Sequence, residues 1–170
     1  MIKTVSALVF TAVLMLGFEG GTAMAQQNKS NTAWDIRCTK DDDGQETDQC
    51  EMFSKISVKD TGQRVVEFAI RKAEKDPGRV AEGIIILPLG ILLPPGVKMQ
   101  IDSGEDYSFN LRSCTQAGCF AVVSLNQQLI NQMKGGIEAK IRFANTQGKP
   151  IRLNLSLKGF TKAWNELKKR

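Results

Sequence analysis

The chain has 170 residues and a formal net charge of +5, and it contains no histidine. Because imidazole is the commonest general acid or base and metal ligand near neutral pH, its absence excludes Ser-His-Asp and Cys-His hydrolases and histidine-ligated zinc, copper and haem sites. Hydrophobic residues make up 42% of the chain, and this length and composition are typical of one folded soluble domain.

The first 25 residues have the three parts of a secretory signal peptide. Lys3 supplies the basic start, Val5 to Phe18 form an apolar run, and Ala23-Met24-Ala25 matches a small-residue cleavage site. The run is shorter than the roughly 20 residues that a membrane-spanning helix needs, which favours cleavage after Ala25 over a membrane anchor. We therefore expect a periplasmic or secreted protein in three parts: a signal peptide (residues 1–25), a flexible leader (26–32) and a single β-sandwich domain (33–170).

All four cysteines lie after the predicted cleavage site. In an oxidising compartment, an even number of cysteines at local spacings predicts disulfides, and four cysteines allow three pairings. We favour Cys38 with Cys50 and Cys114 with Cys119, because a polar, turn-like segment lies between the members of each pair. A thiol oxidoreductase is disfavoured, since its Cys-x-x-Cys motif at a helix start is missing.

Most of the remaining chain alternates between apolar and polar residues, which is the period of a half-buried strand. Turn signals at Thr61-Gly62 and from Asn145 to Gly148 predict two hairpins. About eight strands with one polar face predict an all-β fold, mainly an antiparallel β-sandwich or barrel-like, rather than a parallel α/β sheet. The predicted strands are Trp34 to Cys38, Cys50 to Val58, Gln63 to Ala73, Val97 to Asp102, Tyr107 to Arg112, Cys119 to Val123, Ile137 to Phe143 and Ile151 to Leu157.

Two segments have the 3.6-residue period of an amphipathic helix instead. Ser124-Leu125-Asn126-Gln127 has the form of a capping box, and a Gly135-Gly136 stop follows it. The sequence thus predicts one short internal helix and a C-terminal amphipathic helix. Their apolar stripes are Leu125, Leu129, Ile130 and Met133 in the first, and Phe160, Ala163, Trp164 and Leu167 in the second.

The segment from Ile84 to Pro95 has no charged or polar side chain, and prolines interrupt it. One interpretation is a central strand buried on both faces, followed by a turn at Pro94-Pro95-Gly96. The other is an exposed apolar ridge that binds a partner, since large exposed apolar patches mark interaction sites. Homodimerisation is the simplest use of such a ridge. The candidate interaction surface consists of Ile84, Ile86, Leu89, Ile91 and Leu93.

The order of these features resembles the invasion-associated locus B family of alphaproteobacterial envelope proteins. The resemblance implies a secreted or periplasmic, β-rich protein associated with the outer membrane, in a family named for host-cell invasion by its pathogenic members. It supplies no catalytic residues. The residues that carry it are Trp34 with Cys38, Cys50, the apolar run from Leu87 to Val97, Ile101-Asp102, Cys114 to Cys119 with Gly118, and Leu157-Lys158-Gly159-Phe160 followed by Ala163.

The sequence offers little for catalysis or for a cofactor. No carboxylate pair, Ser-Lys dyad or nucleophile elbow stands out, so we expect no enzyme and no cofactor. Asp41, Asp42, Asp43 and Glu46 carry oxygen ligands suited to calcium, but their spacing does not match an EF-hand loop. We interpret them as a solvated turn without a metal. An exported chain without a recognised motif is not expected to bind nucleic acid.

The leading hypothesis is a non-enzymatic envelope protein that acts as an interaction module for a protein or cell-surface partner. The positive net charge adds anionic surfaces to the candidate partners, although lysines that only solvate the exterior explain the same charge. The alternative hypothesis is a periplasmic carrier of an apolar or amphipathic ligand, with the segment from Ile84 to Leu93 lining a cleft. An enclosed cavity lined by these residues would favour the carrier.

Overall fold

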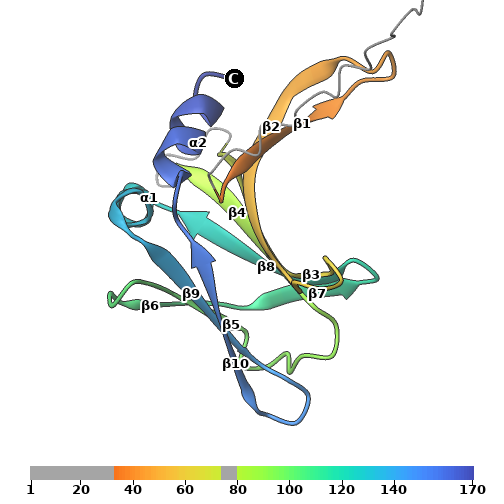
Figure 1. Cartoon of the computed structure of the whole chain (residues 1–170), viewed down its shortest axis with the longest axis vertical. Helices are drawn as coiled ribbons and strands as arrows, with labels where there is room; N and C mark the ends of the chain where they lie inside the picture. Colours follow the sequence, from red (N-terminus) through yellow and green to blue (C-terminus); the bar gives the residue numbers. More distant parts are fainter. Residues whose placement is uncertain (1–32, 74–79) are drawn as a thin grey trace, which may run out of the picture.

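Figure 1 shows the computed structural model, which describes residues 33–73 and 80–170. The predicted signal peptide and flexible leader lie outside the described residues. The described part contains ten strands and two helices, and neither of these helices is long and apolar enough to cross a membrane.

The ten strands form two antiparallel sheets. One sheet has six strands in the order β1-β2-β3-β4-β8-β7, and the other has four in the order β10-β9-β5-β6. The strands are β1 (Asp35–Lys40), β2 (Glu46–Ser57), β3 (Arg64–Lys72), β4 (Ala81–Leu87), β5 (Val97–Ile101), β6 (Asp106–Phe109), β7 (Leu111–Thr115), β8 (Gly118–Leu125), β9 (Glu138–Ala144) and β10 (Pro150–Ser156).

The two sheets pack face to face around one apolar core, as the alternating sequence pattern predicted. The inner face of the six-stranded sheet is more apolar than the outer face of the same sheet. Met52, Ile70 and Val123 lie there and are fully buried, together with Phe68 and Ile85 in the next inward-facing row. The antiparallel sandwich class is therefore confirmed.

One predicted strand is in fact two strands in different sheets. The alternation from Tyr107 to Arg112 predicts a single strand, but the chain leaves the four-stranded sheet at Phe109 and enters the six-stranded sheet at Leu111. Phe109 pairs with Val97, whereas Leu111 pairs with Ala121. The prediction was wrong because both sheets share the core, so the same alternation continues when the strand changes sheet.

Both predicted helices are present (Figure 1), and each buries apolar residues in the core, although Leu125 of the first predicted stripe belongs to β8. Helix α1 is Gln127–Gly135, and helix α2 is Phe160–Leu167. The predicted capping box at Ser124 was wrong, because Ser124 and Leu125 still belong to β8. The side chain of Asn126 caps α1 instead and accepts a hydrogen bond from the Leu129 N–H at 2.9 Å.

Helix α2 is held against the start of β1 by an aromatic contact. The ring of Trp34 meets that of Phe160 edge to face, with centroids 5.0 Å apart. The indole Nε1 of Trp34 also donates a hydrogen bond to the Ser156 carbonyl at 2.9 Å. Trp34 is thus buried between the first strand and the last helix and has a structural role.

Both disulfides are present with the pairing that the sequence favoured. Cys38 bonds to Cys50 across β1 and β2, and Cys114 bonds to Cys119 across β7 and β8. In each case the two cysteines are direct partners in the register of an antiparallel pair. The described cysteines are all oxidised.

Candidate interaction site

The outer face of the six-stranded sheet is the more unusual surface of the molecule. In Figure 1, the strongly curved strands β2 and β3 have both helices and the four-stranded sheet on one side. No described helix or strand covers the other side. A sheet face that is open to water is normally polar, so its side chains show whether it serves more than solubility.

Apolar side chains run across four adjacent strands on this outer face. Phe53, Ala69, Ile84 and Val122 are direct register partners in β2, β3, β4 and β8. Ile86 and Phe120, also direct partners, lie two residues further along β4 and β8. These six residues are called the outer apolar patch. Five of them are half-buried, and Ala69 is buried between its neighbours.

A network of charged side chains borders the outer apolar patch. Glu67 is only 5% exposed, although it alternates with the apolar Val66 and Phe68 and so falls on the polar face of its strand. One carboxylate oxygen of Glu67 accepts a bond from Arg37 at 2.6 Å, and the other accepts one from Arg64 at 3.2 Å. Arg37 also reaches Glu51 at 2.5 Å. Two arginines thus compensate the buried carboxylate.

Arg37 connects this charged network to the outer apolar patch. Its guanidinium carbon lies 4.4 Å from the centroid of the Phe53 ring. Burial lowers the pKa of Arg37, but hydrogen bonds to Glu67 and Glu51 outweigh that effect and raise its pKa above the ordinary value. The guanidinium therefore stays charged, and it holds the ring of Phe53 and the carboxylate of Glu67 in a fixed arrangement.

The five residues of the sequence-derived candidate surface are divided between three environments. Ile84 and Ile86 belong to the outer apolar patch, on β4. Leu89 and Leu93 are in the loop that follows β4 and are 56% and 50% exposed. Ile91 is 7% exposed and forms a bridge with Asn145, so it belongs to the core. The segment is thus a central strand followed by an exposed loop, and it combines parts of both interpretations.

Sequence reasoning missed the aromatic members of the outer apolar patch. Phe53 and Phe120 are 67 residues apart in the chain and come to the same sheet face only because β3 and β4 join β2 to β8. A usable signal was present in β8, where the run Phe120-Ala121-Val122-Val123 is apolar at every position. Such a continuous run indicates a strand with two apolar faces.

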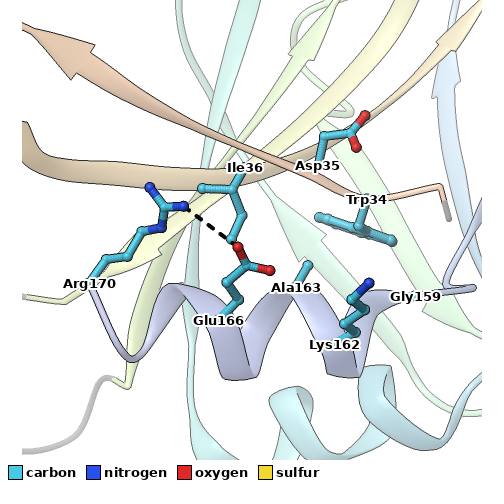
Figure 2. Close-up of a pocket in the computed structure, with 8 residues that line it drawn as sticks. All are labelled: Trp34, Asp35, Ile36, Gly159, Lys162, Ala163, Glu166 and Arg170. Atoms are coloured by element: carbon cyan, nitrogen blue, oxygen red, sulfur yellow. Dashed lines mark ion pairs between the residues drawn. The ribbon is translucent and has the colours of Figure 1, made fainter. Parts of the chain in front are cut away.

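Two surface cavities lie in the described part of the molecule, and the second shares Arg37 and Glu51 with the charged network beside the outer apolar patch. Figure 2 shows the first cavity, which lies between the start of β1 and α2. Its volume is about 220 Å³, and Trp34, Lys162 and Glu166 are among its lining residues. Glu166 forms an ion pair with Arg170 at 3.6 Å. The second, of about 740 Å³, surrounds the Cys38–Cys50 disulfide and has a mixed-charge lining. The segment from Ile84 to Leu93 lines neither cavity, so they give the carrier hypothesis no support.

The acidic residues near the first disulfide form an exposed turn. Asp41 Oδ1 accepts hydrogen bonds from the N–H groups of Asp43 at 3.1 Å and Gln45 at 2.8 Å. Gly44 has a φ of 80°, which a glycine adopts without strain. The Asp41 carboxylate thus stabilises the turn between β1 and β2.

The fold and this face define a class of protein: a disulfide-bonded antiparallel β-sandwich with an apolar outer sheet face. The chain belongs to the Invasion associated locus B (IalB) protein family, whose model matches residues 34–168. The resemblance seen in the sequence is thereby confirmed.

Relatives named for invasion match nearly the whole chain. Invasion protein B homologs from two Brucella abortus strains are each 26% identical over 165 residues, covering 96% of this chain and 91% of theirs. The crystal structure of invasion associated protein B from Bartonella henselae matches with a TM-score of 0.69 and 25% identity, covering 81% of this chain and 92% of that one. The family is thus named for invasion and not for an enzymatic activity.

Proposed function

We propose that this chain is an exported, non-enzymatic interaction module that binds a protein partner through the outer apolar patch. The observation that carries the proposal is the continuous apolar surface across β2, β3, β4 and β8, on a sheet face that no described element covers. The relatives are named as invasion proteins, which favours a partner in the envelope or on a host-cell surface.

The composition of this face supports a protein partner. Protein interfaces combine an apolar centre, often aromatic, with a polar rim that contains arginine. Here Phe53 and Phe120 lie in the apolar part, and Arg37 and Arg64 lie beside it. Because ion pairs already hold the side chains of Arg37 and Arg64, these two residues lose less conformational entropy when a partner binds.

The contacts of the buried Glu67 carboxylate favour binding over catalysis. Both carboxylate oxygens of Glu67 accept bonds from arginines, so neither oxygen is directed at a substrate. A catalytic carboxylate needs access to the proton or atom on which it acts. We therefore assign Glu67 a structural role at the border of the interaction surface.

Export is the second part of the proposal. The sequence of residues 1–25 and two structural disulfides both suit an oxidising compartment. If the protein is exported by a cleaved signal peptide, N-terminal sequencing of protein recovered from the periplasm will begin at Gln26. A sequence that begins at Met1 would contradict this part alone.

The binding proposal is tested with two matched isoleucine variants. Ile86→Ser removes an apolar side chain from the outer apolar patch, and Ile137→Ser removes one that is 79% exposed before β9, in the other sheet. The tagged mature protein and both variants are incubated with envelope extract and with host-cell surface extract, and the captured proteins are quantified by mass spectrometry. Thermal unfolding confirms that each variant is folded.

The expected result is one protein that the parent and Ile137→Ser retain and that Ile86→Ser loses by ten-fold or more. Capture by all three proteins alike would overturn the proposal. Sedimentation of the purified protein separates a partner from self-association: a dimer that Ile86→Ser converts to a monomer would assign the patch to a second copy of the chain instead.

A further inference from the structure

The outer face of the four-stranded sheet has a different character, because three cations lie in one row across it. Lys98 on β5 is the direct register partner of Arg142 on β9, and Arg142 is the partner of Arg152 on β10. These three residues are called the basic row. Like charges directly opposite each other on a sheet face lower the stability of the sheet. The basic row therefore lowers the stability of the fold, and the fold does not require it.

The acidic residues of this face leave the basic row with excess positive charge. Asp106 pairs with Arg142, and Glu138 lies 3.6 Å from Lys140, outside the row. Among the residues that the structure describes, Lys98 and Arg152 have no ion pair, and both are exposed. Two of the three cations are therefore free to meet an external anion.

Arg142 has an unused hydrogen-bond donor in the middle of the row. Its Nε is buried and has no partner, and it is the one such side-chain atom in the described ranges. A buried donor without an acceptor costs free energy. The Nε itself is shielded from solvent, so an anion with several oxygen atoms, such as a phosphate group, is met from outside by the exposed Lys98 and Arg152, while Arg142 adds positive charge between them.

The basic row is flat and extended. Adjacent strands lie about 4.8 Å apart, so the row spans roughly 10 Å across three strands. None of its residues lines either of the two cavities described above. A flat line of cations fits a planar array of anionic groups better than one small anion in a pocket.

Exposed apolar residues lie at the same end of the sheet as the basic row. The loop after β4 bridges to the end of β9 through Ile91 and Asn145, and the Leu92 N–H donates to the Ala144 carbonyl at 2.9 Å. This loop carries the exposed Leu89 and Leu93. Basic residues combined with exposed aliphatic ones are typical of segments that bind the interface of an anionic membrane.

We infer that the basic row is a docking surface for an anionic phospholipid membrane. Lys98 and Arg152 donate to headgroup phosphates, Arg142 adds positive charge between them, and Leu89 and Leu93 contact the boundary of the acyl chains. The inference goes beyond the proposed function, because it concerns the other sheet and a different class of partner.

The test is sedimentation of the mature protein with phosphatidylglycerol vesicles, and with phosphatidylcholine vesicles for comparison. The row variant is Lys98→Gln with Arg152→Gln. Its matched control is Lys168→Gln with Lys169→Gln at the end of α2, which also removes two positive charges from exposed residues. Each basic residue near an anionic surface changes partitioning about five-fold. The row variant should therefore partition roughly 30-fold more weakly than the parent.

The expected result also includes binding by the parent and the control that falls as salt increases, and little binding to phosphatidylcholine. Equal losses in both variants would show that net charge alone attracts the protein, and would overturn the inference. Absence of binding by the parent would overturn it as well. Undiminished vesicle binding in the presence of millimolar inorganic phosphate is expected; full competition by it would assign the row to a free anion.

Discussion

Glu67 shows how one buried charge shapes its surroundings. A carboxylate with 5% exposure needs compensation, and the two arginines that bind it come from β1 and from the start of β3. The ion pairs therefore connect an edge strand to the middle of the sheet. Because Arg37 also lies over Phe53, the same contacts set the position of an aromatic side chain in the outer apolar patch.

Replacing this carboxylate should destabilise the fold measurably. Glu67→Gln removes the charged acceptor that Arg37 and Arg64 share, and we expect a loss of about 1–2 kcal/mol in the free energy of unfolding, because Arg37 keeps its pair with Glu51 and both arginines keep some access to water. Glu166→Gln is the control, since it removes an exposed pair with Arg170 and should cost less than about 0.5 kcal/mol. Urea unfolding measures both values, and equal values would contradict the prediction.

The sequence predicted some residues of the candidate site but not their arrangement. Ile84 and Ile86 stood out because they lie in an uncharged run. Alternation placed Glu67 on the polar side of its strand, yet that side is crowded because β3 lies between two other strands. Alternation separates two faces of a strand, but it does not show which strands will be neighbours or how far a polar face is shielded.

At the scale of elements, local patterns predicted most of the strands and both helices. The errors occurred where one local pattern fits two structures. Ser124-Leu125-Asn126-Gln127 fits a capping box, but Leu125 pairs with Ala81 and extends β8. The pairing of Leu125 in β8 contributes more to stability than a cap at Ser124 would. The helix therefore begins later than the capping box predicts, with Asn126 as its N-cap. The change of sheet at Asn110 left no local signal at all.

The two disulfides should contribute to stability independently. Their sequence separations are 12 and 5 residues, and in the chain-entropy model such loops contribute about 3 and about 2 kcal/mol. We expect Cys38→Ala with Cys50→Ala, and Cys114→Ala with Cys119→Ala, each to lower the free energy of unfolding by that order. The variant without any cysteine should lose about 5 kcal/mol, since the bonds lie in different strand pairs.

Urea unfolding of the three variants measures these losses, and the parent protein in reducing buffer provides the control. Reduced parent protein and the cysteine-free variant should have similar stability. A cysteine-free variant as stable as the oxidised parent would refute the structural role of the two bonds.

At the scale of the whole molecule, the sandwich separates two chemically different outer surfaces. The outer apolar patch lies on the six-stranded sheet, and the basic row lies on the four-stranded sheet, with the shared core between them. A protein that binds a partner on one face and a membrane on the other holds that partner beside the membrane.

Because the two surfaces share no residue, their functions should separate by mutation. Lys98→Gln with Arg152→Gln should lose vesicle binding and keep partner capture, and Ile86→Ser should show the reverse. Sites this far apart without common contacts behave additively. Sedimentation and capture with the same protein preparations test this, and loss of both activities in either variant would contradict the separation.

The positions of the disulfides have a consequence beyond stability. Strands β1 and β7 are the two edges of the six-stranded sheet, and each is covalently bonded to its inner neighbour. An edge strand offers unpaired backbone groups to which another chain can add, which is a common start of aggregation. Each bond limits how far an edge can peel away and recruit a second molecule. Chains would thus be most prone to self-assembly into fibrous or amorphous material during the interval before their thiols are oxidised.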